Sequence, residues 1–109
     1  MERPDIENIT ASRLKKRLDA GNGPVLLDVR EPWEFRLARI EGSRLIPMSE
    51  LGERVAELDP GAETVVICHH GHRSSHVTRA LQGAGFEKVS NLEGGLDAYS
   101  FVDASVPRY

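Results

Sequence analysis

The residues able to do chemistry are concentrated in one short stretch, Cys68 to Ser74, which holds the only cysteine of the chain. The thiolate is the nucleophilic form of cysteine, and a free thiol ionises only near pH ~8.5, so a reactive site must favour the anion. Arg73 and the unpaired N–H groups of a following helix can do so. Gly71 lets the backbone curl so that N–H groups point inward, and Ser74 or Ser75 can cap the helix. The pattern predicts a reactive cysteine, with a buried structural cysteine as the alternative.

Three histidines lie inside this stretch and a fourth, His76, follows it. Imidazole and thiolate are common zinc ligands, but zinc sites usually draw ligands from separated segments, and these four residues lie close together in one. We therefore expect no metal and no other cofactor, and we expect His76 to be a solvated helix residue. The expected substrate-binding residues around the catalytic Cys68 are His69, His70, Gly71, His72, Arg73 and Ser74.

Arg73 allows two interpretations. Its guanidinium offers several donors in a fixed fork, which suits a small oxyanion, and this is the role that we expect. The structural alternative is an ion pair at the start of the helix with an acid such as Glu93 or Asp28. We expect Asp28 and Arg30 to buttress a neighbouring strand end by paired hydrogen bonds.

The elements that must position this stretch alternate between strand and helix. Val65, Val66 and Ile67 form a β-branched block, typical of a strand buried on both faces of a parallel sheet, and Val77 and Leu81 follow at helical spacing. Alternation of this kind predicts an α/β domain with a mainly parallel sheet, in which ligands bind beyond the carboxyl ends of the strands. Cys68 stands at such an end. The expected strands are residues 6–9, 25–29, 45–46, 64–67 and a short one at Val89; the expected helices are 11–20 capped by Thr10, a turn from Pro32, 51–58, one ending at Gly83 to Gly85, and 95–101.

Two further expectations concern the periphery of the site. Trp33 and Phe35 are expected to fill the core beneath the cysteine loop, as aromatic residues usually do in a small domain. Gly94 and Gly95 are expected to allow tight passage of the backbone beside the pocket. The segment from Asp103 to Tyr109 is expected to be loosely ordered.

Length and charge limit the possible functions. The chain has 109 residues, enough for one domain over 1–109 with its own core, and a formal charge of −3 with both signs interspersed. Without a broad basic stripe, nucleic acid is not an expected partner. A single cysteine excludes an internal disulfide and a resolving cysteine in the same chain. The charged start and the lack of a long apolar run predict a cytoplasmic protein without a membrane span, as a monomer or weak dimer.

The stretch from Cys68 to Ser74 resembles the active-site loop of single-domain rhodaneses, the thiosulfate sulfurtransferases and their relatives. Further motifs of that family follow one another in the expected order over nearly the whole chain: Leu27–Phe35 (LDVREPWEF), Ile40–Ser43 (IEGS), Ile46–Pro47 and Asn91–Tyr99 (NLEGGLDAY). The resemblance implies a three-layer α/β/α domain with a five-stranded sheet. Two positions depart from the family pattern, Arg39 where relatives often have histidine and Tyr99 where they often have tryptophan, which leaves the acceptor preference open.

The resemblance also implies a reaction. A sulfane sulfur would pass from thiosulfate or a similar donor to Cys68 as a persulfide, and then to cyanide or a thiol, protein thiols included. Cysteine-dependent phosphatases and arsenate reductases are an alternative, but four residues separate Cys68 from Arg73, and the phosphatase loop is usually longer. The shorter loop favours a sulfur atom over a tetrahedral oxyanion. A second alternative is a non-catalytic binding or sensor module.

Overall fold

Five parallel strands form the sheet of this protein, in the order β1-β5-β4-β2-β3. The computed structural model describes residues 5–109. The central strand is β4, and Cys68 follows directly at its carboxyl end. The strands are β1 Glu7–Ile9, β2 Val25–Asp28, β3 Arg44–Leu45, β4 Thr64–Ile67 and β5 Val89–Leu92.

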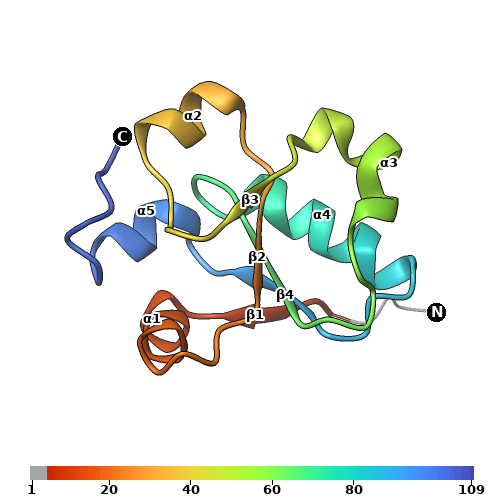
Figure 1. Ribbon diagram of the computed structural model, residues 1–109, viewed down its shortest axis with the longest axis horizontal. Coiled ribbons are helices and arrows are strands. Elements are labelled where there is room, and N and C mark those ends of the chain that lie inside the picture. The colour runs from red at the N-terminus through yellow and green to blue at the C-terminus, as the bar shows by residue number, and fades with distance from the viewer. Residues whose placement is uncertain (1–4) are drawn as a thin grey trace.

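Helices cover both faces of this sheet (Figure 1). Residues of α1 and α5 pack on one face, and residues of α3 and α4 pack on the other. The expected three-layer α/β/α architecture with a parallel sheet is therefore confirmed. The helices are α1 Ala11–Asp19, α2 Pro32–Leu37, α3 Leu51–Arg54 between the 3₁₀ turns Met48–Glu50 and Val55–Glu57, α4 His72–Gly83 and α5 Gly95–Ser100.

The central strand feeds both hydrophobic cores. Side chains of a strand alternate between faces, so Val65 and Ile67 enter the core under α1 and α5, and Val66 and Cys68 enter the core under α4. All four residues of β4 are buried. The β-branched block predicted to be covered on both faces is therefore confirmed, and it anchors the cysteine at a rigid point of the fold.

Local sequence signals placed most of the elements within one or two residues. The Thr10 side chain accepts a hydrogen bond of 3.2 Å from the backbone N–H of Arg13, as expected of the residue that caps α1. The prediction that Ser74 or Ser75 caps α4 is wrong. Gly71, with φ of +98°, is the residue that precedes the helix, and it makes the turn without a side-chain cap.

Two predictions about side chains outside the loop are also wrong. Trp33 lies 55% exposed on α2, and Phe35 is only half-buried, with the Arg39 guanidinium 4.7 Å from its ring. Glu34 between them is the buried residue of α2, because its carboxylate finds polar partners inside the protein. The segment from Asp103 to Tyr109 is packed rather than loose, since Val106 lies in the core and Tyr109 reaches the cysteine loop.

Within residues 5–109, the helices are all too short or too polar to cross a membrane.

Candidate active site

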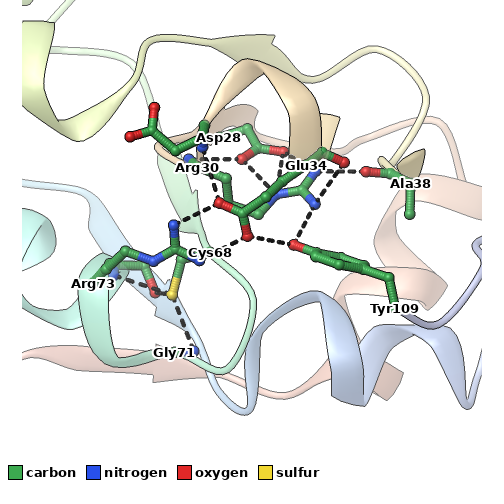
Figure 2. Close-up of polar contacts among 10 residues, drawn as sticks. Asp28, Arg30, Glu34, Ala38, Cys68, Gly71, Arg73 and Tyr109 are labelled. Atoms are coloured by element: carbon green, nitrogen blue, oxygen red, sulfur yellow. Dashed lines mark hydrogen bonds and ion pairs between the residues drawn. The ribbon is translucent and has the colours of Figure 1, made fainter. Parts of the chain in front are cut away.

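The sulfur of Cys68 lies inside the turn that joins β4 to α4. The backbone N–H of Gly71 points at Sγ with an N···S distance of 3.1 Å (Figure 2). The backbone N–H of Ser74 does so at 3.3 Å, and the Ser74 hydroxyl lies 3.2 Å from the sulfur. Such inward-facing amides stabilise negative charge on sulfur. The residue is only 1% exposed, so the loop covers its sulfur closely.

The loop keeps this shape because α5 binds its carbonyl groups from behind. The N–H groups of Leu96 and Asp97 donate to the carbonyl oxygens of Cys68 and His69 at 2.8 and 3.0 Å. Gly95 makes this approach possible, since it has φ of +63° and a Cβ there would lie 2.4 Å from the His69 oxygen. The expected tight backbone passage at this glycine is confirmed. With their carbonyls held on one side, the loop amides are free to face the sulfur.

A chain of side-chain hydrogen bonds leads from the sulfur into the sheet. The Ser74 hydroxyl, next to Sγ, donates a short hydrogen bond to Oδ1 of Asn91 on β5. Nδ2 of Asn91 in turn donates to Oδ1 of Asn8 on β1, at 3.0 Å. Asn8 and Asn91 are directly opposite in the parallel register of the two strands. The sheet itself therefore aligns this chain with the cysteine.

Arg73 forms an ion pair with Glu34 of α2. Nη1 and Nη2 donate to the two carboxylate oxygens at 2.7 and 2.9 Å, a bidentate geometry. These bonds lower the pKa of the Glu34 carboxyl to about 2 despite its burial, and they raise the pKa of Arg73. The predicted ion-pair partners of Arg73, Glu93 and Asp28, are wrong. Asp28 pairs with Arg30 instead. Glu34 is oriented toward Arg73 by the start of α2, where its Oε1 accepts a hydrogen bond of 3.0 Å from the backbone N–H of Glu31.

Tyr109 closes this cluster from the far end of the chain. Its hydroxyl donates to Oε2 of Glu34 at 2.8 Å and accepts from Nη1 of Arg30 at 2.7 Å (Figure 2). Its ring stacks on that of His69, with centroids 3.9 Å apart and planes 8° from parallel. Burial raises the pKa of the hydroxyl to about 12, so it stays a donor at neutral pH. One side chain thus links the ion pair to the cysteine loop.

Asp28 and Arg30 form a second ion pair, fully buried at the end of β2. Nη2 and Nε of Arg30 donate to the Asp28 carboxylate at 2.7 to 3.1 Å, and Nη2 also reaches the carbonyl of Ala38 at 2.6 Å. The expected buttress is therefore confirmed. Because Arg30 also bonds Tyr109, the two ion pairs belong to one network.

The loop histidines occupy different positions. The His69 ring is stacked between the rings of His70 and Tyr109, its Nε2 is buried without a hydrogen-bond partner among the described residues, and burial lowers its pKa. His70 and His72 are exposed, as is His76, in keeping with its expected place on the solvated face of α4. The predicted loop residues thus surround Cys68 unequally, since only Gly71 and Ser74 hydrogen-bond its sulfur.

One group of possible ligand atoms near the loop comes from two segments, which the spacing of the histidines alone did not indicate. His69, His70 and Asp97 of α5 each offer an atom within 4.8 Å of the others. Oδ1 of Asp97, however, accepts a hydrogen bond of 3.3 Å from Nε of Arg108, so a cation would share this carboxylate with a guanidinium. We assign no metal to this group.

Four hydrogen-bonded residues behind the loop were not singled out from the sequence as site residues: Glu34, Asn91, its partner Asn8, and Tyr109. Glu34 carried a signal, because Pro32 and the spacing from Glu31 to Glu34 are typical of a helix start that fixes its third side chain. Asn91 stood in a family motif without an assigned role. Tyr109 carried no signal, since an isolated tyrosine after a polar segment gives no periodicity to read.

Comparison with known proteins adds independent information on this arrangement. The family model for the rhodanese-like domain matches residues 10–101. The chain is 36% identical over 95 residues to the putative sulfurtransferase YtwF of Bacillus subtilis, covering 87% of this chain and 91% of that protein. It is also 36% identical over 78 residues to the thiosulfate sulfurtransferase GlpE of Ectopseudomonas mendocina, covering 72% of each. A crystal structure of a rhodanese-related protein from Thermoplasma volcanium superposes with a TM-score of 0.83 at 32% identity, covering 94% of this chain and 99% of that one.

Other relatives are much longer proteins. In several curated proteins, the part that matches this chain makes up only about a quarter to a half of the whole length, namely 39%, 49% and 24% in three of them. The domain is therefore used both nearly alone and as one part of larger chains.

Proposed function

The chain belongs to the family of rhodanese-like domains, and on that premise we propose that it transfers a sulfane sulfur through a persulfide on Cys68. Relatives of similar length are named sulfurtransferases, which supports this class of activity. The observation that carries the proposal is the position of Sγ, which faces the N–H groups of Gly71 and Ser74 at hydrogen-bond distance. A sulfur nucleophile and its anionic products need that environment.

The first half-reaction loads the cysteine. The Cys68 thiolate attacks the outer sulfur of thiosulfate or a similar sulfane donor, a new S–S bond forms, and the S–S bond within thiosulfate breaks. Sulfite leaves with the electron pair of the broken bond, and Cys68 persulfide remains. The amides of Gly71 and Ser74 hold negative charge on the sulfur throughout.

The second half-reaction unloads it. Cyanide or a thiolate attacks the outer sulfur of the persulfide, and the Cys68 thiolate leaves with the S–S electron pair. Thiocyanate or a new persulfide is the product, so the cycle requires no external oxidant or reductant. The chain has no second cysteine to intercept the persulfide, which supports release to an outside acceptor, a small molecule or a protein thiol.

We assign attraction of the donor to Arg73 and the loop histidines. The bonds to Glu34 use two N–H donors of the Arg73 guanidinium, and its remaining donors can bind oxygens of a sulfonate group. Because Glu34 balances its charge, Arg73 is a weaker anion site than an unpaired arginine. Thiosulfate and phosphate esters are both dianions, so this balance of charge does not separate the two reactions, and the short loop from Cys68 to Arg73 remains the reason to place the phosphatase function second.

Incubation with thiosulfate and cyanide, followed by detection of thiocyanate, tests the proposal. We expect thiocyanate, and after thiosulfate alone we expect intact-protein mass spectrometry to show the mass of one added sulfur. Cys68→Ser should abolish both signals. Ser75→Ala is the matched control, because the Ser75 hydroxyl bonds the carbonyl of His72 and not the sulfur. Failure to form thiocyanate and to load sulfur from any donor would favour a binding module, and hydrolysis of an aryl phosphate would favour a phosphatase.

A further inference from the structure

The Ser74 hydroxyl has one proton and two neighbours that can accept it. Cys68 Sγ lies 3.2 Å from Oγ, and Oδ1 of Asn91 lies on its other side at short hydrogen-bond distance. An amide oxygen carries no proton, so the hydroxyl must donate to Asn91 in this arrangement. We propose that Asn91 competes with Cys68 for the Ser74 proton and thereby sets how readily the thiol ionises. This makes Asn91 a positioning residue for the sulfur transfer proposed above, on which its catalytic meaning rests.

The orientation of the Asn91 amide is fixed from the far side. Its Nδ2 donates to Oδ1 of Asn8 at 3.0 Å, which turns its Oδ1 toward Ser74. Asn91 is buried between β1 and β4, whereas Asn8 is exposed. The acceptor next to the Ser74 hydroxyl is therefore built into the sheet and is not part of the cysteine loop.

This arrangement suits the protonated thiol. With its proton on Asn91, the Ser74 oxygen presents lone pairs to the sulfur and can accept the S–H of Cys68. A thiolate in the same place would face those lone pairs. To donate to the anion, the hydroxyl must rotate its proton to Sγ, and Oδ1 of Asn91 then loses its donor in a buried site. A substitution that removes Oδ1 of Asn91 leaves no buried acceptor to lose its donor when the Ser74 proton turns to Sγ. Ionisation of Cys68 should then become easier.

The charged and titratable groups around the sulfur come from every neighbouring element. Arg73 of α4 pairs with Glu34 of α2, and Asp28 pairs with Arg30 at the end of β2, so both pairs are internally neutral. The remaining groups are His69, His70 and His72 of the loop and of the start of α4, Asp97 of α5 and Tyr109. None of these groups hydrogen-bonds the Asn91 side chain, whose hydrogen-bond partners among the described residues are the side chains of Ser74 and Asn8. A substitution at Asn91 therefore tests the hydroxyl proton and not the charge of the site.

The test is a pH titration of the Cys68 thiolate by its ultraviolet absorbance, with Cys68→Ser as the blank, since the chain has a single cysteine. In Asn91→Leu we expect the midpoint to fall by about one pH unit, the effect of a hydrogen bond gained by a charged group. Below the midpoint, the thiolate fraction should rise about tenfold, and the rate of sulfur loading by about threefold to fourfold, because the nucleophilicity of a thiolate falls with its pKa. In a Ser74→Ala background the same substitution should leave the midpoint unchanged.

Two more variants keep the test decisive. Asn8→Ala, at an exposed position, frees the Asn91 amide to rotate and should lower the midpoint by less than Asn91→Leu does. If Asn91→Leu does not fold, the midpoint of Asn8→Ala tests the proposal in its place. Ser90→Ala, on the same strand, is the matched control and should have no effect. A midpoint that stays or rises in the Asn91 and Asn8 variants, or a shift that persists without the Ser74 hydroxyl, would overturn the proposal. The titration needs no sulfur donor, so it can succeed even if no thiocyanate is formed and the proposed function fails.

Discussion

Glu34→Gln is the substitution that most directly probes the network beneath the cysteine loop. The carboxylate is 5% exposed and accepts both Nη groups of Arg73, the Tyr109 hydroxyl and the N–H of Glu31. The amide of glutamine keeps the shape but loses the charge and one acceptor oxygen. We expect the variant to fold and to be less stable than the original protein at neutral pH.

The magnitude follows from the pKa of the carboxyl group, which falls from 4.5 to about 2 on folding. At about 1.4 kcal/mol per pKa unit, that difference corresponds to about 3 kcal/mol of stability. Arg73 is 37% exposed, so solvent screening reduces the expected contribution to about 2 kcal/mol. Because the folded pKa is the lower one, this stability is present above pH 4.5 and is lost as the pH falls toward 2.

Urea unfolding at a series of pH values measures this contribution. The fluorescence of Trp33 is a suitable signal, because it is the only tryptophan and its ring lies edge-on to Tyr109, with centroids 6.4 Å apart. We expect the original protein and Glu34→Gln to differ by about 2 kcal/mol at pH ~7 and to converge near pH ~2. Glu63→Gln breaks an exposed pair with Arg17 and serves as the control, with an expected cost below about 1 kcal/mol.

Parallel loss of stability by the two proteins between neutral and acid pH would refute this reasoning. It would mean that the Glu34 carboxylate contributes no more than a solvated side chain, and that the bidentate pair with Arg73 does not hold the loop. Equal costs for Glu34→Gln and the Glu63 control would lead to the same conclusion.

The remaining predictions concern the backbone and the buried polar groups. Gly95→Ala places a Cβ 2.4 Å from a loop carbonyl oxygen at φ of +63°, and should cost about 3 kcal/mol or more in urea unfolding and abolish sulfur loading. Gly52→Ala, on a helix with open space around it, should instead stabilise by about 0.5–1 kcal/mol, and the reverse order would contradict this packing. Asp28→Asn leaves the buried charge of Arg30 without its partner and should cost about 3–5 kcal/mol by the same measurement; a cost below about 1 kcal/mol would show that water reaches the guanidinium. Tyr109→Phe removes the two hydroxyl hydrogen bonds and should lower stability by about 1 kcal/mol in thermal unfolding, with an unchanged melting temperature as the contrary result.

The sequence by itself determined the framework of this protein and the place of its reactive sulfur. The apolar block before Cys68, the cap at Thr10 and the turn at Gly71 are local signals, each read from a few neighbouring residues. The resulting elements agree with the structure because a central parallel strand is covered on both faces and every helix start needs partners for its free N–H groups. The number of strands and the three-layer arrangement followed from the family motifs, not from the local signals, and the order of the strands came from the tertiary structure.

Only the tertiary structure decided which polar groups meet behind the loop. Arg73 and Glu34 lie 39 residues apart in the chain, and Tyr109 reaches Arg30 across 79 residues. Whether Glu34 or Trp33 of α2 faces the interior depends on the groups that line the interior at that point. Those groups are the guanidinium of Arg73 and the hydroxyl of Tyr109, which bind a carboxylate, and so Glu34 is buried and Trp33 is exposed. Hydrophobicity and periodicity measure the preference of each residue for water. They carry no information on the pairing of charges brought together from distant segments, and that pairing fixes the partner of Arg73, the position of Tyr109 and the direction of the Ser74 proton.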